Sequence, residues 1–157
     1  MIALPMRIVV SILVILTLLF VGTRLYYFFI VNPRIVVELQ SEPNGERAQR
    51  VMLLTLPDGS TIPVNYLQEG QVVFVGADGQ WWREFGDNWK DVEIFLQGAI
   101  LNGHAVAITN DPQYRDGIFT RLRPTAPTWL PEWAKGVLVK ITIAEAQWTS
   151  QDLLDTK

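Results

Sequence analysis

The sequence predicts a mainly β fold: a small antiparallel β-barrel with one or two helices, preceded by a single transmembrane helix. Three features of the chain predict it. A long apolar stretch occupies residues 8–31, and about six short apolar runs follow, with turn residues between them. These runs do not alternate with helical segments, as a parallel α/β sheet would require. Antiparallel strands that close into a barrel are therefore the simplest arrangement.

Residues 8–31 contain one charged side chain, Arg24. About 20 apolar residues are enough to cross the hydrocarbon core of a bilayer. Arg24 lies near the C-terminal end of the stretch, where its side chain can reach the headgroups, and Tyr26 and Tyr27 are typical of the interfacial aromatic belt. Pro33 is expected to end the helix. We therefore predict an uncleaved membrane anchor.

Two alternatives to the anchor stay open at this point. A cleaved signal peptide would have Arg7 in its n-region, but residues 21–23 (VGT) form a poor small-x-small cleavage site, and apolar residues resume soon after them. A buried core helix is the other alternative. If the segment is an anchor, the cations that follow it, Arg34, Arg47 and Arg50, favour a single-pass membrane protein with a cytoplasmic C-terminal domain.

The charge of the chain excludes several classes of partner. Residues 1–34 hold three arginines and no acid, which leaves 10 basic and 16 acidic residues, a formal charge of −6. Such a domain repels nucleic acid, so no nucleic-acid partner is predicted. The chain has no cysteine and one histidine, His104, so no disulfide, thiolate metal site or cysteine nucleophile exists, and no metal site is predicted. Catalytic residues stay unknown, because the scattered carboxylates show no paired acid–base motif.

The expected domains are the anchor at 1–34, a linker with the first strand at 35–48, and the barrel at 49–157. Within the barrel, three strands come first. They cover residues 50–56, 61–67 and 71–75, with Pro-Asp-Gly and Glu-Gly turns between them. In the second of these strands Ile62, Val64 and Tyr66 share one face. The three pair most simply as a meander.

The second half of the barrel contains one clear helix. Asp111 and Pro112 begin it, since Pro is favoured at the first helical position, and it runs to about Arg121. The other elements are a short helical turn at 80–87 and strands at 91–96, 99–109 and 137–143. The hairpin between 91–96 and 99–109 turns at Gln97–Gly98, unless Asn102–Gly103 forms a bulge or the true tip. The tail from Ala144 could be helical.

Two adjacent tryptophans, Trp81 and Trp82, follow the strand that ends at Val75. Each ring carries roughly 200 Å² of surface that is normally buried. They either plug the barrel core or form the wall of a ligand site, and at helical spacing one ring could do each. Arg83 follows them and could bind an anion, or pair with Asp87 one helical turn away.

The order of these elements and three motifs carry a resemblance to a known family. The motifs are VFVG at 73–76, WWREF at 81–85 and VEIFL at 92–96. Over roughly residues 50–143 the chain resembles the deazaflavin-dependent nitroreductase family, which has the split β-barrel fold of flavin-binding oxidoreductases. The resemblance implies a deazaflavin coenzyme or FMN as cofactor, and a lipophilic acceptor such as a quinone or a nitro compound.

In this family the strand, the turn and the Trp-Trp-Arg segment lie beside the cofactor. The resemblance therefore implies these cofactor-binding residues: Val75, Gly76, Ala77, Gly79, Trp81, Trp82, Arg83 and Tyr66. Asn65 lies where the family has a pocket-lining residue.

The chain departs from the family at three acidic positions. Asp58 stands in a segment, 57–63, where many members carry a basic loop for the cofactor phosphate, and Asp78 and Glu84 replace neutral or basic residues. Each change places negative charge near the expected anion. The alternative hypothesis is therefore a barrel that has lost its cofactor and serves as a non-catalytic accessory or assembly subunit of a membrane complex. A homodimer is a further partner compatible with the sequence.

Trp129 and Trp133 lie in a proline-rich segment that no motif explains. Its tryptophans could belong to a lid, to a dimer contact, to a patch that lies on the membrane, or to a strap that covers one end of the barrel.

Overall fold

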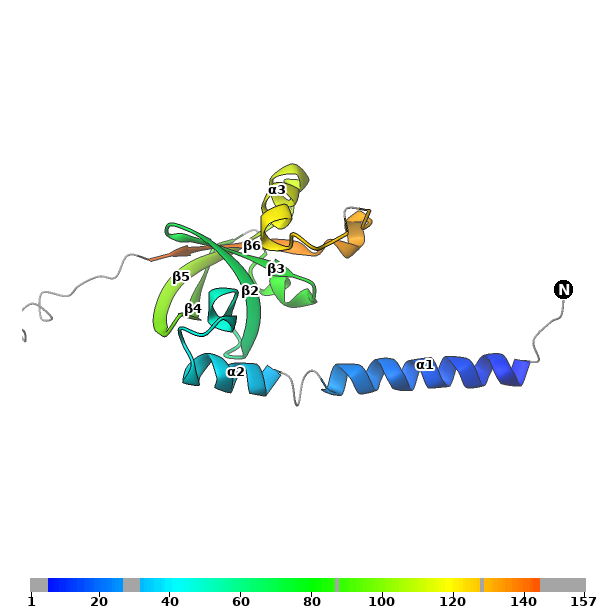
Figure 1. Ribbon diagram of the computed structural model, residues 1–157. Coiled ribbons are helices and arrows are strands. Elements are labelled where there is room, and N and C mark those ends of the chain that lie inside the picture. The colour runs from blue at the N-terminus through cyan, green and yellow to red at the C-terminus, as the bar shows by residue number, and fades with distance from the viewer. Residues whose placement is uncertain (1–5, 27–31, 87, 128, 145–157) are drawn as a thin grey trace, which may run out of the picture. The chain divides into compact units, whose positions relative to one another are not determined.

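The computed structural model describes residues 6–26, 32–86, 88–127 and 129–144 (Figure 1). The chain separates into two compact units, Met1–Glu38 and Leu39–Lys157. The predicted helical tail beyond Ala144 lies outside the described residues. The predicted boundaries at residues 34 and 48 stay predictions.

The first unit contains α1 (Met6–Tyr26). Its window Met6–Thr23 has a mean hydropathy of 2.4, so by length and composition it is a candidate membrane span. Its hydroxyl groups are satisfied inside the helix: Ser11 donates to the carbonyl of Arg7, and Thr17 to that of Leu13, at 2.9 and 2.8 Å. Internal satisfaction of polar groups is what a hydrocarbon environment demands of a helix.

Helix α2 (Asn32–Ser41) corrects two expectations. Pro33 was expected to end a helix, and the first strand was expected within residues 35–48. Instead Pro33 is the second residue of α2, which is physically acceptable because the first turn of a helix needs no backbone donor there. After α2 the chain makes a short 3₁₀ turn, η2 (Arg47–Gln49), and enters the first strand only at Val51.

In the described residues of the second unit, six strands form a closed antiparallel barrel in the order β1-β2-β3-β6-β5-β4. The strands are β1 (Val51–Thr55), β2 (Thr61–Glu69), β3 (Val72–Ala77), β4 (Lys90–Leu96), β5 (Ala99–Ile108) and β6 (Val137–Ile143). The predicted fold class is confirmed, and each strand predicted from residue 50 onward lies within two residues of its expected bounds. Closure leaves no sheet edge unpaired.

The barrel interior is filled by alternating side chains. On β2, Ile62, Val64 and Tyr66 point inward, as their alternation predicts. They meet fully buried residues from the other strands, and Phe85 joins the same core from the segment after β3. The fully buried residues include Met52, Leu54, Val73, Val75, Ile94, Val139 and Ile141.

Helix α3 (Pro112–Leu122) covers the outside of β3 and β6 (Figure 1). Asp111 caps it by accepting the N–H of Tyr114 at 2.9 Å, so the predicted helix start is confirmed. Ile118 and Phe119 of the helix form a second core with Phe74 of β3 and Leu138 of β6. Strand β3 is thus buried on both faces, which explains why its sequence is apolar without alternation.

The β4–β5 hairpin turns at Gln97 and Gly98, whose φ angles are 48° and 87°. Asn102 and Gly103 are neither a bulge nor the tip: they pair regularly with Glu93 and Val92. The glycine at 103 has a packing cause instead. A Cβ there would lie 2.8 Å from the carbonyl oxygen of Thr142 on the neighbouring strand, which is backbone and cannot give way.

We predict that Gly103→Ala destabilises the barrel by about 1–3 kcal/mol, because the added methyl forces the β5–β6 pair apart. The matched control is Gly117→Ala on the exposed side of α3, where nothing lies within 4 Å of the new methyl. That variant should stabilise by up to about 1 kcal/mol through helix propensity. Thermal unfolding of the full chain in mild detergent, followed by circular dichroism, measures both. Equal effects of the two variants would contradict the packing argument.

Candidate functional site

Most of the site residues that the sequence predicts lie at the end of β3 and in the turn that follows it. In the structure these residues lie on two opposite faces of the strand. Val75 and Ala77 are buried in the barrel core. Gly76 belongs to the opposite face of the strand, where Arg123 covers it: a Cβ on Gly76 would lie 2.4 Å from a guanidinium nitrogen. Only glycine permits this approach of the arginine to the strand backbone.

Arg123 follows the last turn of α3 and clamps the turn after β3. Its Nη1 donates to Oδ1 of Asp78 at 2.6 Å, and its Nη2 donates to Oδ2 of Asp78 at 2.9 Å and to the carbonyl of Gly76 at 3.0 Å. The guanidinium also lies over the ring of Phe119, 5.1 Å from its centroid. A cation thus reaches the turn from a residue 45 positions beyond Asp78 in the chain. Sequence motifs did not identify Arg123, because only the packing of α3 on β3 brings it there.

The segment η3 (Gln80–Glu84) places both tryptophans against the barrel core. Trp81 meets Phe85 edge-on, with 6.1 Å between ring centroids, and Trp82 is also partly buried. The expected split, with one ring in the core and one at a pocket, is not seen: both pack on the core and both keep part of their surface exposed.

Arg83 lies over the ring of Trp82, with its guanidinium carbon 5.6 Å from the centroid, and donates to the side chain of Gln80 at 3.2 Å. Its predicted partner Asp87 lies outside the described residues. Gly79 lies close to Trp81, whose ring would be 3.3 Å from a Cβ on that glycine. The η3 segment therefore carries a Trp–Arg pair, and the turn before it carries the contact with Arg123.

Tyr66 has a structural role in the barrel. Its hydroxyl donates to the carbonyl of Ala48 at 2.9 Å and accepts from Nε2 of Gln97 at 2.8 Å. Burial raises the pKa of Tyr66, so the phenol stays neutral. Asn65, its neighbour on β2, is exposed.

A cleft of about 290 Å³ adjoins Arg123, between α3 and the segment 124–135, which we call the proline strap. Its walls are apolar, and Arg123 and Lys135 supply two cations against one carboxylate, Asp116. The lining residues are Asp116, Phe119, Thr120, Arg123, Pro124, Ala126, Pro127, Leu130, Ala134 and Lys135. A cleft of this size is at the small end of those that bind organic ligands.

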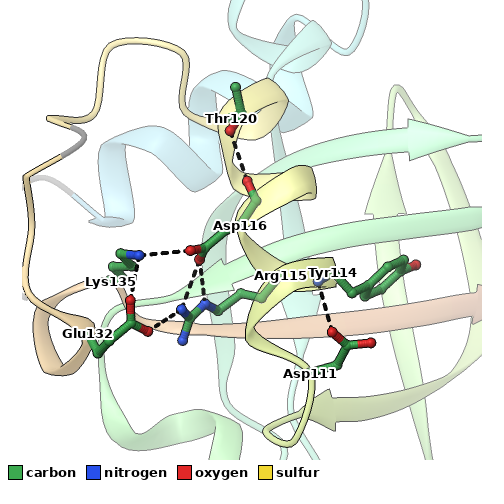
Figure 2. A network of polar contacts seen from close by, with 7 residues as sticks. All are labelled: Asp111, Tyr114, Arg115, Asp116, Thr120, Glu132 and Lys135. Atoms are coloured by element: carbon green, nitrogen blue, oxygen red, sulfur yellow. Dashed lines mark hydrogen bonds and ion pairs between the residues drawn. The ribbon is translucent and has the colours of Figure 1, made fainter.

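An ionic network fastens the strap to α3 (Figure 2). Asp116 of the helix accepts from Arg115 and from Lys135, both at 2.8 Å, and Glu132 of the strap pairs with the same two cations. The hydrogen bond from Lys135, with help from Arg115, holds the pKa of Asp116 below its ordinary value and lowers that of Glu132 as well. The bond to Asp116, then the bond to Glu132, raises the pKa of Lys135.

A second, open cleft of about 440 Å³ involves strands β4 and β5. At its rim Nδ1 of His104 lies 2.7 Å from Oδ1 of Asp91, and both side chains are mostly exposed. Glu93 and Asn102 also line it. Among the residues that the structure describes, no three His, Asp or Glu side chains converge as metal ligands.

Comparison with known proteins adds little beyond the fold. No protein-family model matches the chain, and no curated protein matches it. One matching solved structure is a Listeria innocua protein described as a "putative pyridoxamine 5'-phosphate oxidase". It is 15% identical, the match covers 72% of this chain and 93% of that one, and the TM-score is 0.48. A similarity this low assigns neither cofactor nor activity, so the resemblance to the deazaflavin-dependent nitroreductases stays a prediction.

The lowered carboxyl pKa values predict how the strap responds to acid. A carboxyl whose pKa is lower in the folded chain stabilises fully above the ordinary value, near 4, and loses this effect as the pH falls through the folded pKa. At pH 7, Asp116→Asn should therefore melt about 1–5 °C below the wild type. The gap should narrow as the pH falls below about 4. Melting curves of both proteins in detergent between pH 3 and 8 measure it, and a gap independent of pH would contradict the prediction.

Proposed function

We propose that this chain is a membrane-anchored, oxidoreductase-like barrel that binds a flavin or deazaflavin cofactor at the turn after β3. Its acceptor would be a lipophilic molecule such as a quinone or a nitro compound. The observation that supports the proposal is the position of Arg123. It supplies the cation that the 57–63 segment lacks, at the turn Gly76–Asp78 where the resemblance implies the cofactor.

The residues at this turn suit the parts of such a cofactor. A guanidinium fork binds phosphate oxygens in pairs, as it binds the carboxylate of Asp78 here. The Trp82 ring with Arg83 above it offers a flat surface for an aromatic ring system. The cofactor itself would supply the hydride chemistry, and the barrel would bind and orient it.

Asp78 opposes this function, because its carboxylate already occupies both nitrogens of the Arg123 fork. An incoming phosphate must displace the carboxylate or share the guanidinium with it. Two charges of the same sign about 4 Å apart in a partly hydrated site repel each other by roughly 1–4 kcal/mol. We therefore infer weak binding by the native chain, with Asp78 as the residue that weakens it.

The pairing of Arg123 with Asp78 also favours a second candidate function. This is a non-catalytic barrel that serves as an accessory or assembly subunit of a membrane complex. In this case Arg123 and Asp78 are a structural pair that fixes α3 to the barrel. Tyr66 is likewise fully bonded within the chain. The two candidates differ in one property, which is whether releasing Arg123 from Asp78 creates affinity for a phosphate-bearing ring.

The deciding measurement is a titration of the full chain in mild detergent with FMN and with deazaflavin coenzyme, followed by quenching of tryptophan fluorescence. Asp78→Asn should bind at least about fivefold more tightly than the wild type, since roughly 1 kcal/mol of repulsion is removed. Arg123→Gln should bind more weakly. Glu93→Gln is the matched control, because it removes one carboxylate at the other cleft and should leave the affinity unchanged.

Binding by neither the wild type nor Asp78→Asn at tens of micromolar would overturn the proposal in favour of the accessory subunit. Circular dichroism of Arg123→Gln shows whether the loss of its three hydrogen bonds has unfolded the domain. The Asp78→Asn result stands without that variant, because Arg123 keeps its bond to the Gly76 carbonyl there.

We also propose that α1 spans the membrane once and that the barrel is cytoplasmic. The full chain should then stay in membranes after alkaline carbonate extraction, and a chain without Met6–Thr23 should not. The chain has no cysteine, so Ile100→Cys gives a single label site on an exposed side chain of β5. An impermeant maleimide should label it only after the cells are lysed. Labelling in intact cells would contradict the cytoplasmic location.

A further inference from the structure

Trp129 in the proline strap is the most exposed large hydrophobic side chain in the described part of the second unit. Its exposed fraction is 78%, against 66% for Ile100 and 52% for Trp89. The ring of Trp89 is partly covered by Lys140, whose Nζ lies 6.0 Å from the ring centroid. Among the aromatic rings that the structure describes in this unit, the next most exposed is that of Trp89, so an indole this open to water is unusual here.

The strap holds Trp129 in place rather than leaving it on a loose loop. Pro124, Pro127 and Pro131 fix three backbone angles. The N–H of Ala126 donates to the carbonyl of Arg123, just before the strap, and the N–H of Ala134 donates to that of Pro131 within it. The ionic network then ties the far end to α3 (Figure 2). Its neighbour Leu130 lines the cleft, whereas Trp129 does not.

We propose that the proline strap docks on the surface of the bilayer, with the Trp129 indole in the headgroup region. The proposal rests on the proposed membrane anchor. A span in the same chain keeps a bilayer within the length of the tether at all times, so even a weak contact is populated. An indole is suited to this partner, because it combines a large apolar face with one N–H donor and collects at membrane interfaces.

The charges around the strap fit a neutral lipid surface. The domain as a whole is acidic and is repelled by anionic lipid, but the cations and acids of the strap neutralise one another. Lys135 pairs with Asp116 and Glu132, and Arg123 pairs with Asp78. The contact therefore depends on the indole rather than on anionic headgroups. It would hold the cleft between α3 and the strap close to the membrane surface, where lipophilic molecules are concentrated.

The absence of native cysteine allows a direct test. Thr125→Cys places one environment-sensitive fluorophore on the exposed part of the strap and leaves Trp129 intact. The full chain is reconstituted into phosphatidylcholine vesicles that contain lipids with a nitroxide near the headgroup. Glu93→Cys, on the exposed side of β4, carries the control label. We expect at least twofold stronger quenching of the Thr125 label than of the control label.

Adding Trp129→Ser should reduce the quenching of the Thr125 label to the level of the control label. The Trp129 side chain is exposed, so we expect the variant to fold. Weak quenching of the Thr125 label in a protein that resists carbonate extraction would overturn the docking and leave the anchor intact. A label that is shielded from water but not quenched by the lipid nitroxide would also overturn it, in favour of a protein contact. Loss of the protein from the vesicles would refute the anchor separately.

Discussion

The contact of Arg123 with the turn after β3 is the interaction on which the part of the domain outside the barrel, α3 and the proline strap, depends. One guanidinium joins the end of α3 to the backbone of Gly76 and to both oxygens of Asp78. It fixes the residue type at 76, because any side chain there would occupy the place of the arginine. It also forms part of the wall of the cleft beneath the strap. A change at this contact therefore acts on packing, on charge and on the cleft together.

Two other sets of contacts hold α3 and the proline strap in place. One set is apolar and the other is ionic. The apolar contact of Phe119 and Ile118 with Phe74 and Leu138 is buried and insensitive to pH. The network of Arg115, Asp116, Glu132 and Lys135 has exposed carboxylates and mostly buried cations, and it depends on pH through the carboxylates. We infer that α3 stays on the barrel when the carboxylates are protonated, while the strap is released first. The three attachments thus give the strap a lower local stability than the helix that carries it.

Local chemistry made much of the fold predictable from the sequence. Apolar alternation located β2, and Asp111 with Pro112 located the start of α3. The failures came from contacts that a local pattern does not contain. Gly103 resembled a turn residue, although it is a glycine because a Cβ there would lie 2.8 Å from the carbonyl oxygen of Thr142 on β6. Pro33 resembled a helix end because proline is allowed in the first turn as well as after the last. At the candidate site, the sequence indicated the Trp-Trp-Arg segment but not Arg123, since tertiary packing alone brings Arg123 to Asp78.

Asp78 connects the two hypotheses about function through one physical effect. In a barrel that binds an anionic cofactor, a bound phosphate neutralises the arginine at the turn, and the empty protein carries an unpaired, partly buried cation. Here Asp78 supplies that negative charge from within the chain, so Arg123 is paired without a ligand. The same carboxylate lowers the affinity for any phosphate that competes with it. If the chain binds such a cofactor as proposed, the internal partner of Arg123 and the weakness of that binding would be two consequences of one side chain.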